Sequence, residues 1–332
     1  MPVWLNPAYD IRSAPRDLKF VIIGGGGWLG RATLDILYQL LGKEDFGRRT
    51  LVLGSRLREI RVAEGVSVMS QPLEDFDPRA LTDSIFFYYS FLTKDKVKAG
   101  STEDYIATNR AISDRVHVLA TLSKPRALIL PSSGAVYDRN GELERDIEQN
   151  PYGALKVVDE SRFGELMERL GGCYVVPRIF GLSGEYINKH EAYALAGFIN
   201  DAQAGRPIEI RARHEVFRSY MYIGDLMGLT LSLTLGSQHQ SVTFDTVGEE
   251  VVEIEELAKR VTGCLGVAPV PIVRSRVPCL ARDWYVGNGA LLEGLLRRVG
   301  AKQLTLDSQI LRTAKFLGSE SAGGMAEIGR CR

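Results

Sequence analysis

The stretch that most constrains this chain runs from Phe20 to Gly42 as "FVIIGGGGWLGRATLDILYQLLG", with four consecutive glycines. Glycine loses more backbone freedom on folding than any other residue, so ordering four in a row is costly. The glycines directly follow an apolar run that predicts a buried strand over 19–23, and they precede a helical spacing of apolar residues over 31–41. This order of strand, turn and helix indicates a place where the backbone must approach a ligand or another element closely.

The spacing of the glycines indicates what this turn binds. Gly24, Gly27 and Gly30 form the pattern G-x-x-G-x-x-G. One such glycine permits the tight turn, one lets the backbone approach a pyrophosphate, and one lets the helix pack on the strand. The amides of Trp28 and Leu29, at the start of the helix, add the positive end of its dipole. The pattern predicts a dinucleotide site, and an ordinary glycine-rich turn is the alternative.

Strand and helix signals alternate along the first 180 residues. We predict further buried strands at 50–53, 66–69, 84–89, 127–130 and 173–179, and helices at 104–122 and from the cap residue Asn150 onward. This rhythm predicts an α/β fold with a doubly wound parallel sheet covered on both faces. The pattern loosens from Phe180 onward, which predicts a second, smaller domain, and the small and polar residues 318–332 predict a flexible tail.

The composition excludes several classes of protein. The 332 residues suffice for about two domains, and 41 Lys and Arg balance 41 Asp and Glu, so we expect neither a nucleic-acid nor a membrane partner. No apolar run approaches the roughly 18 residues that span a bilayer, and the start lacks the layout of a signal peptide, so we expect a cytoplasmic protein. The four cysteines and four histidines are scattered, so we expect no metal site.

The end of the second predicted strand bears on which dinucleotide binds. A carboxylate there would hold the ribose 2′-hydroxyl of NAD, but this chain has "LVLGSRLRE", with Gly54 at that place followed by Ser55 and Arg56. Without a carboxylate a 2′-phosphate meets no repulsion, and Arg56 can bind it bidentately. We therefore expect NADP(H) rather than NAD(H). The alternative is that Arg56 and Arg58 are surface residues at the start of a helix.

A serine, a tyrosine and a lysine occur further along at positions that suit redox chemistry. Ser133 lies in "PSSGAVYD" at the end of a predicted parallel strand, where such sheets bind ligands. Tyr152 and Lys156, in "PYGALK", are four residues apart on a predicted helix and so share a face. An ammonium beside a phenol stabilises the phenolate, so Tyr152 can exchange a proton with an alcohol or carbonyl oxygen as hydride moves.

Together these motifs resemble an extended short-chain dehydrogenase/reductase of the sugar-nucleotide epimerase/dehydratase/reductase group. "IGGGGWLG", "SSGAVYD" and "PYGALK" are similar to its glycine, serine and tyrosine–lysine motifs, and the resemblance extends over about residues 19–317. "DYIATNRAISDRV" resembles a helix motif that includes Asn109, and "RSYMYIGDL" one that begins at Arg218. The resemblance implies that Asn109 lies at the cofactor and that Arg218 approaches the nucleotide diphosphate. Where many relatives have small residues after the fourth strand, this chain has "FFYYSFL" with the bulky Tyr88 and Tyr89.

The family implies a Rossmann domain and a C-terminal domain that binds a sugar nucleotide. We assign residues 1–180 to the NADP-binding domain, with 219–248 returning to it, and residues 181–218 and 249–317 to the substrate domain. The family also implies a homodimer formed through two helices of each subunit, here near 104–122 and 151–170. "GLSGEYINKHE" would help shape the sugar pocket, with Asn188 and Lys189 as substrate-binding candidates and an exposed polar loop as the alternative.

The residues directly after Ser133 narrow the reaction. Dehydratases of the family carry an Asp-Glu pair, but this chain has Gly134 and Ala135 there, and carboxylates from Glu142 or Glu144 are the weaker alternative. NADP suits net reduction, since epimerases often keep NAD bound. We predict a 4-ketoreductase of a nucleotide-linked keto-deoxy sugar, in which Ser133 orients the carbonyl. A 4-epimerase, a non-catalytic NADP-binding protein and a reductase of steroid or flavonoid-like ketones are the alternatives.

Overall fold

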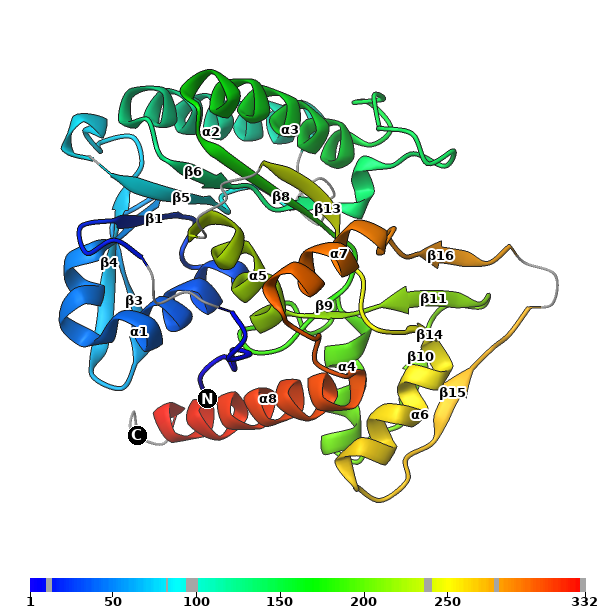
Figure 1. Cartoon of the computed structure of the whole chain (residues 1–332). Coiled ribbons are helices and arrows are strands. Elements are labelled where there is room, and N and C mark those ends of the chain that lie inside the picture. The colour runs from blue at the N-terminus through cyan, green and yellow to red at the C-terminus, as the bar shows by residue number, and fades with distance from the viewer. Residues whose placement is uncertain (10–13, 82, 94–100, 236–240, 278–280, 329–332) are drawn as a thin grey trace. The chain divides into compact units, whose positions relative to one another are not determined.

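The chain folds into two compact units, which we describe separately. The structure, a computed structural model, describes residues 1–9, 14–81, 83–93, 101–235, 241–277 and 281–328 (Figure 1). The larger unit consists of Pro7–Ile179 and Met227–Asp245, and the smaller unit of Met1–Asn6, Phe180–Leu226 and Thr246–Arg332. The chain returns to the larger unit at Met227 rather than at the expected residue 219, and its first six residues group with the smaller unit.

One nine-stranded sheet forms the centre of the larger unit. Its strands are β1 (Lys19–Ile23), β2 (Thr50–Gly54), β3 (Arg58–Ala63), β4 (Val66–Pro72), β5 (Ser84–Tyr88), β6 (Ala127–Ile129), β7 (Ser132–Ser133), β8 (Cys173–Ile179) and β13 (Val242–Asp245). They lie in the order β13-β8-β6-β5-β1-β2-β4-β3, with β7 paired to β8. Every pair is parallel except β3 with β4. The predicted doubly wound parallel sheet is confirmed.

The order in which the chain adds parallel strands to the sheet reverses between β1 and β5. The chain runs outward from β1 through β2 to β4 and then returns to β5 on the other side of β1. Loops at the carboxyl ends of strands on either side of such a switch point diverge and leave a crevice in which open α/β sheets bind ligands. The glycine turn follows β1, and Tyr89 follows β5, so both lie at this switch point.

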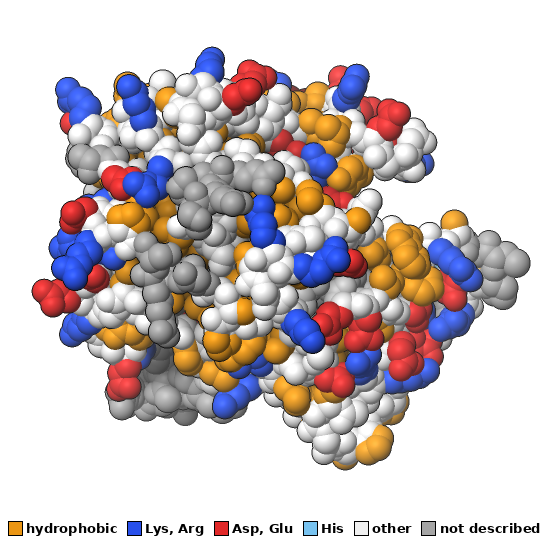
Figure 2. All heavy atoms as spheres, viewed as in Figure 1, with side chains coloured by type: hydrophobic (Ala, Val, Ile, Leu, Met, Phe, Trp, Pro, Cys, Tyr) orange, Lys and Arg blue, Asp and Glu red, His pale blue; other side chains and the backbone are white. Residues whose placement is uncertain are grey.

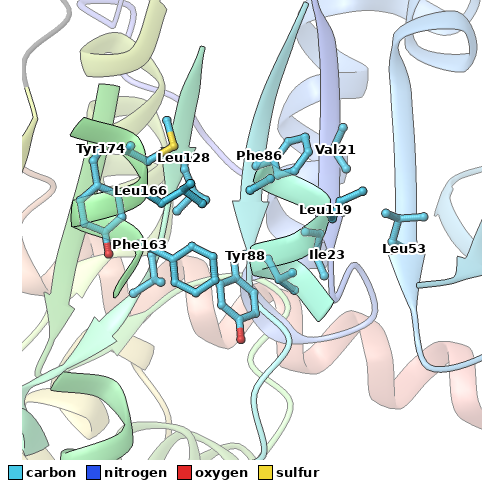
Figure 3. Close-up of a cluster of buried hydrophobic side chains, with 14 of the residues drawn as sticks. Val21, Ile23, Leu53, Phe86, Tyr88, Leu119, Leu128, Phe163, Leu166 and Tyr174 are labelled. Atoms are coloured by element: carbon cyan, nitrogen blue, oxygen red, sulfur yellow. The ribbon is translucent and has the colours of Figure 1, made fainter. Parts of the chain in front are cut away.

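Helices cover both faces of this sheet (Figure 1). α2 (Thr102–Ser123) and α3 (Pro151–Leu170) lie on one face, and α1 (Trp28–Arg49) lies on the other. Figure 3 shows the core under α2 and α3, where side chains of the helices meet those of the strands. Residues of β1 and β5 are buried on both faces, which explains why these strands are almost continuously apolar in sequence.

Sequence reasoning missed strand β3. It forms a hairpin with β4 at the edge of the sheet, and only Ile60 of its residues is fully buried. Charged residues on an edge strand discourage pairing with another chain, so Arg58, Glu59 and Arg61 suit the place but give no apolar signal. Arg58 begins this strand, so the alternative that placed it at a helix start is wrong.

The smaller unit combines helices with short strands. These are β9 (Leu182–Ser183), α4 (Ala194–Gln203), β10 (Ile208–Ile210), β11 (Val216–Ser219), β12 (Met221–Tyr222), β14 (Val251–Glu253), α6 (Ile254–Leu265), β15 (Ile272–Arg274), β16 (Asp283–Tyr285), α7 (Ala290–Val299) and α8 (Leu306–Ile328). The strands form the small sheets β10-β15, β14-β11-β16 and β12-β9. The division between the units falls within α5 (Ile223–Leu235). Residues 318–328, expected in a tail, continue α8, and 329–332 lie outside the described residues.

Candidate active site

The glycine turn packs tightly at the switch point. Gly24 has φ 99°, in the region that favours glycine, and a Cβ there would lie 2.8 Å from the Ser90 nitrogen. A Cβ at Gly30 would collide with the backbone of Gly24 and Gly25. Gly27 caps α1 without a side-chain hydrogen bond, and Trp28 and Leu29 follow as its first helical residues. A close turn that leads into an uncapped helix N-terminus fits a pyrophosphate.

Two arginines flank this turn from the start of the β3–β4 hairpin. Ser55 and Arg56 form an exposed bend directly after β2. Arg58 is also exposed, and its guanidinium lies over Gly26, because a Cβ at Gly26 would overlap its Nη2. Among the described residues neither arginine makes an ion pair. The sequence drew attention to Arg56, whereas Arg58 joins the glycine turn through a strand that the sequence did not reveal.

The serine turn is fastened to the start of α3 by Asn150. Ser133 ends β7, is 8% exposed and accepts a 3.2 Å hydrogen bond from the Ala135 amide. Asn150 caps α3 by accepting from the Gly153 amide at 3.0 Å, and its Nδ2 donates to the Ala135 carbonyl at 3.1 Å. A Cβ at Gly153 would collide with that same carbonyl. Asn150 therefore sets the position of Tyr152 on its helix relative to the Ser133 turn. The sequence predicted only that Asn150 caps the helix.

The carboxylates of Glu144 and Asp138, after the serine turn, are engaged in holding the chain. Glu144 accepts from Asn150 Nδ2 at 3.0 Å and from the amides of Arg145 and Asp146. Asp138 accepts from two backbone amides of the turn that follows it. These bonds account for the local loop structure, while Glu142, the other carboxylate considered for elimination, is exposed.

Lys156 is buried beside the aromatic ring of Phe91. It is 7% exposed and donates a 3.0 Å hydrogen bond to the Pro131 carbonyl. Its Nζ lies 4.1 Å from the centroid of the Phe91 ring, and that ring meets Tyr152 edge-to-face at 5.7 Å. Burial lowers the pKa of Lys156 to about 8, while the charges of Asp159 and Glu160 oppose the shift. The lysine and the tyrosine of the predicted pair thus both contact Phe91, a residue that the sequence did not suggest.

Asn109 is buried in α2 and holds the segment that follows β5. Its Oδ1 accepts from the Leu92 amide at 2.8 Å and its Nδ2 donates to the Tyr105 carbonyl at 3.2 Å. The hydroxyl of Tyr105 donates to the Leu92 carbonyl at 2.7 Å. Both backbone groups of Leu92, the residue after Phe91, are therefore tied to α2. Direct contact of Asn109 with a cofactor stays a prediction.

The predicted substrate residues lie in the smaller unit. Arg218 in β11 pairs with Asp283 at 2.7 Å, and its guanidinium lies 5.5 Å from the Tyr285 ring centroid. Asn188 is exposed and Lys189 is half-buried in the segment after β9. Arg218 thus has a counter-charge within the protein, and any diphosphate must share the guanidinium with Asp283.

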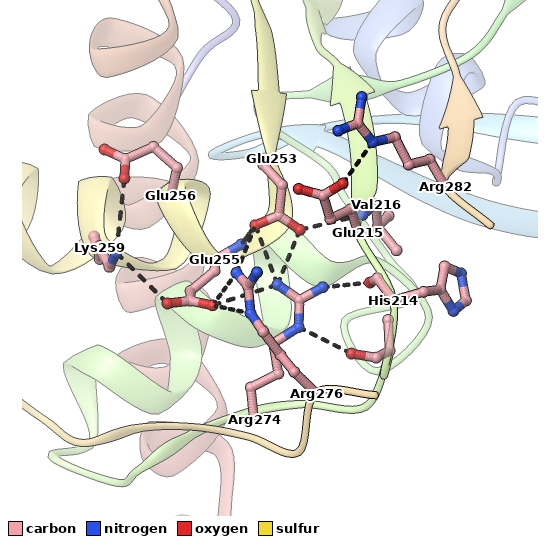
Figure 4. A network of polar contacts seen from close by, with 11 residues as sticks. His214, Glu215, Val216, Glu253, Glu255, Glu256, Lys259, Arg274, Arg276 and Arg282 are labelled. Atoms are coloured by element: carbon pink, nitrogen blue, oxygen red, sulfur yellow. Dashed lines mark hydrogen bonds and ion pairs between the residues drawn. The ribbon is translucent and has the colours of Figure 1, made fainter. Parts of the chain in front are cut away.

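A network of charged residues fixes the strand that carries Arg218 (Figure 4). Arg274 of β15 donates to both carboxylate oxygens of Glu253, at 2.9 and 3.1 Å, and to the Ala212 carbonyl at 3.0 Å. Glu253 in turn accepts from the Val216 amide at the start of β11. The network links β11, β14 and β15 within the smaller unit.

Comparison with known proteins decides the family. The sequence profile of the NAD dependent epimerase/dehydratase family matches residues 20–234. The chain belongs to this family. The prediction of an extended short-chain dehydrogenase/reductase is thereby confirmed, and with it the prediction that the chain is an NAD(P)-dependent enzyme. No curated protein sequence matches the chain.

Solved structures of similar fold include epimerases and a dehydratase. The chain is similar to UDP-N-acetylglucosamine 4-epimerase from Methanobrevibacter ruminantium in complex with UDP-N-acetylmuramic acid, with a TM-score of 0.72 and 18% identity over 92% of this chain and 100% of that one. It is similar to UDP-glucose 4-epimerase from Thermus thermophilus in complex with NAD, with a TM-score of 0.66 and 19% identity over 90% of this chain and 98% of that one. The chain is also similar to an NAD dependent NDP-hexosamine 5,6-dehydratase of tunicamycin biosynthesis, with a TM-score of 0.68 and 15% identity over 91% of this chain and 98% of that one.

The described part of the chain contains no helix long and apolar enough to cross a membrane. Cytoplasmic location stays a prediction. Within the same described ranges, no group of three or more His, Cys, Asp or Glu side chains is arranged to hold a metal ion.

Proposed function

We propose that this family member is an NADPH-dependent 4-ketoreductase that acts on a nucleotide-linked keto-deoxy sugar. The observation that carries the proposal is a serine turn and a Tyr–Lys pair held together by Asn150, while Glu144 and Asp138 are engaged with backbone and side-chain donors. This arrangement supports orientation of a carbonyl and proton transfer to it, whereas Gly134 and Ala135, directly after Ser133, supply no acid or base for elimination of water.

The side chains divide the work at the carbonyl. When bound, the nicotinamide supplies the hydride to the carbonyl carbon. Ser133 donates a hydrogen bond that orients the carbonyl oxygen, and Tyr152 gives its phenolic proton to that oxygen as negative charge develops there. Lys156, charged and poorly solvated, stabilises the phenolate that Tyr152 leaves behind, and its remaining N–H groups suit the ribose hydroxyls.

The preference for NADP(H) is supported by the arginines beside the glycine turn. Arg56 is exposed at the end of β2, Arg58 lies over Gly26, and no carboxylate stands at Gly54. A charge-assisted hydrogen bond contributes roughly 1.5–3 kcal/mol, or about 10- to 100-fold in affinity. Arg56→Ala should therefore abolish most of the preference for NADPH over NADH, and Arg58→Ala should do the same if the phosphate lies over Gly26. Dissociation constants for both cofactors measure this, and an unchanged ratio in both variants refutes the assignment.

A 4-epimerase is the second candidate, because two of the similar structures carry that name. An epimerase returns the hydride to the same sugar and consumes no cofactor, whereas a reductase consumes one NADPH for each sugar.

The test is loss of NADPH absorbance with a panel of enzymatically generated nucleotide 4-keto-6-deoxy sugars, with NADH in parallel. Stoichiometric loss of NADPH with one sugar supports the reductase. Inversion at C4 of a nucleotide sugar that carries a C4 hydroxyl, supplied in parallel and with no net change in cofactor, supports the epimerase. Tyr152→Phe should lower kcat by about 100- to 10,000-fold, and full activity of that variant removes Tyr152 from the mechanism.

The nucleotide end of the substrate is assigned to the smaller unit. Arg218, shared with Asp283, is proposed to bind the diphosphate, and Asn188 and Lys189 to bind the sugar. Arg218→Ala should raise KM for the nucleotide sugar more than it lowers kcat, because its contact is made in ground state and transition state alike.

Two copies are proposed to associate through α2 and α3. Val118 and Leu122 share one face of α2 and are 46% and 56% exposed, and Val158 on α3 is 53% exposed. Figure 2 shows hydrophobic side chains among charged ones over these helices. Leu122→Glu with Val158→Glu should convert a dimer to a monomer in sedimentation velocity, and an unchanged mass refutes this surface.

A further inference from the structure

Phe91 is a bulky side chain that contacts both members of the Tyr–Lys pair. Its ring centroid lies 4.1 Å from Lys156 Nζ, and its ring meets that of Tyr152 edge-to-face, with centroids 5.7 Å apart and planes at 80°. It follows the strand β5 at the switch point, in the stretch "FFYYSFL".

We infer that Phe91 is a positioning residue for catalysis, whose ring face holds the charged Lys156 and whose edge-to-face contact holds Tyr152. The inference deepens the proposed function and rests on it for the catalytic roles of Tyr152 and Lys156. The contacts themselves are independent of what the substrate is.

The first support is the need of Lys156 for partners. A buried ammonium is unfavourable unless other groups replace its water, and this one is 7% exposed and donates to the Pro131 carbonyl. The quadrupole of an aromatic face attracts a cation most strongly where water is excluded. The Phe91 ring face therefore favours the charged form of Lys156, in the same sense as the charges of Asp159 and Glu160 on α3.

The second support is how firmly Phe91 itself is held. The amide and the carbonyl of the next residue, Leu92, are bound by the buried side chains of Asn109 and Tyr105. These two residues are 1% and 3% exposed, so the segment is fixed from α2 in a site with little water. A ring held in this way can fix the rotamers of its two neighbours, which catalysis needs to within about half an ångström.

Two variants distinguish the effect of the aromatic face of Phe91 from that of its apolar volume. Phe91→Leu keeps an apolar side chain but removes the π face, whereas Phe91→Tyr keeps the face. We expect Phe91→Leu to lower kcat about 30-fold with little change in KM. The kcat of Phe91→Tyr should stay within about threefold of the wild-type value. As a matched control, Phe46→Leu removes a ring from an edge-to-face pair with Tyr38 elsewhere in the larger unit, and kcat should not change.

A second readout does not depend on turnover. In protein labelled with ¹³Cε-lysine, the signal of Lys156 is assigned by its loss in Lys156→Arg and titrated by NMR. We expect Phe91→Leu to lower the pKa of Lys156 by about one unit and Phe91→Tyr to leave it within a few tenths. An unchanged pKa in Phe91→Leu overturns the inference, as does equal loss of kcat in the Leu and Tyr variants.

The two readouts keep the failure of this inference distinct from failure of the proposed function. If no sugar is turned over but the Lys156 pKa falls only in Phe91→Leu, the contact stands and the substrate assignment fails. If turnover is found and Phe91→Leu keeps its kcat within about twofold, the reductase stands and the role of Phe91 is refuted.

Discussion

Lys156 carries its charge where little water reaches it, and this makes the stability of the larger unit depend on pH in a direction that can be worked out. Burial lowers the pKa of Lys156 from 10.5 to about 8. Between these values the unfolded chain still binds the proton that the folded chain has released. Since stability rises with pH wherever the unfolded state binds more protons, the free energy of unfolding should rise from about pH 8 to pH 10.5 and be lower and level below pH 8.

The magnitude depends on the size of the shift. A difference of about 2.5 pKa units at 1.36 kcal/mol per unit corresponds to about 3 kcal/mol. This is an upper bound, because the Phe91 ring and the Pro131 carbonyl both favour the charged form. Relative to Lys156→Met, which has no proton to lose, the wild type should gain up to about 3 kcal/mol between pH 7 and pH 10.5.

The assay is urea unfolding of the larger unit at a series of pH values. The chain has three tryptophans, of which Trp28 lies in the larger unit and Trp4 and Trp284 in the smaller one. With Trp4 and Trp284 changed to Phe in every protein compared, fluorescence reports the larger unit.

The quantity to plot is the difference in unfolding free energy between the wild type and Lys156→Met, because groups that titrate equally in both proteins cancel. Lys43→Met is the matched control, because Lys43 lies on the exposed part of α1. The difference in unfolding free energy between the wild type and Lys43→Met should not depend on pH. If the Lys156 difference is also flat from pH 7 to 10.5, the burial of a charged Lys156 is refuted.

Three further substitutions test contacts within each unit. Asn150→Ala removes the cap of α3 and its bond to the Ala135 carbonyl, so the free energy of unfolding should fall by about 1–2 kcal/mol and kcat by about tenfold or more, and an unchanged kcat would contradict its placing of Tyr152. Gly30→Ala should abolish binding of NADP(H) in calorimetry because its Cβ meets the backbone of Gly24, whereas Gly294→Ala, which meets nothing within 4 Å, should bind normally. Glu185→Gln should cost about 3 kcal/mol in unfolding of the smaller unit, since it leaves Arg312 without its buried carboxylate, and a loss below about 1 kcal/mol would count against that pair.

The strands and helices of the larger unit were predictable where their burial is uniform. β1 and β8 occur at the predicted bounds because strands covered on both faces are mostly apolar, and α3 begins at Pro151 because Asn150 caps it. β3 was not predictable, because an edge strand with one buried residue gives neither an apolar run nor a clean alternation.

The site was predictable to the extent that its chemistry lies in local motifs. The glycine turn, Ser133 and the Tyr152–Lys156 pair each occupy a few consecutive residues. Phe91 and Arg58 could not be found in this way, because their roles depend on contacts across the fold that no spacing encodes. The bulky residues after β5 were visible as a departure from the family, and that departure was the available signal for Phe91.

The fate of one hydrogen atom distinguishes net reduction from epimerisation. The enzyme is supplied with a nucleotide 4-keto-6-deoxy sugar and NADPH deuterated at the transferable position of the nicotinamide, and the product is read by mass spectrometry and NMR. A reductase yields a sugar with one deuterium at C4 and one equivalent of NADP⁺, with Tyr152→Phe slowed by about 100-fold or more. An unreduced 4-keto sugar, together with a 4-hydroxy nucleotide sugar that changes configuration at C4 with no net change in cofactor, would contradict the reductase assignment.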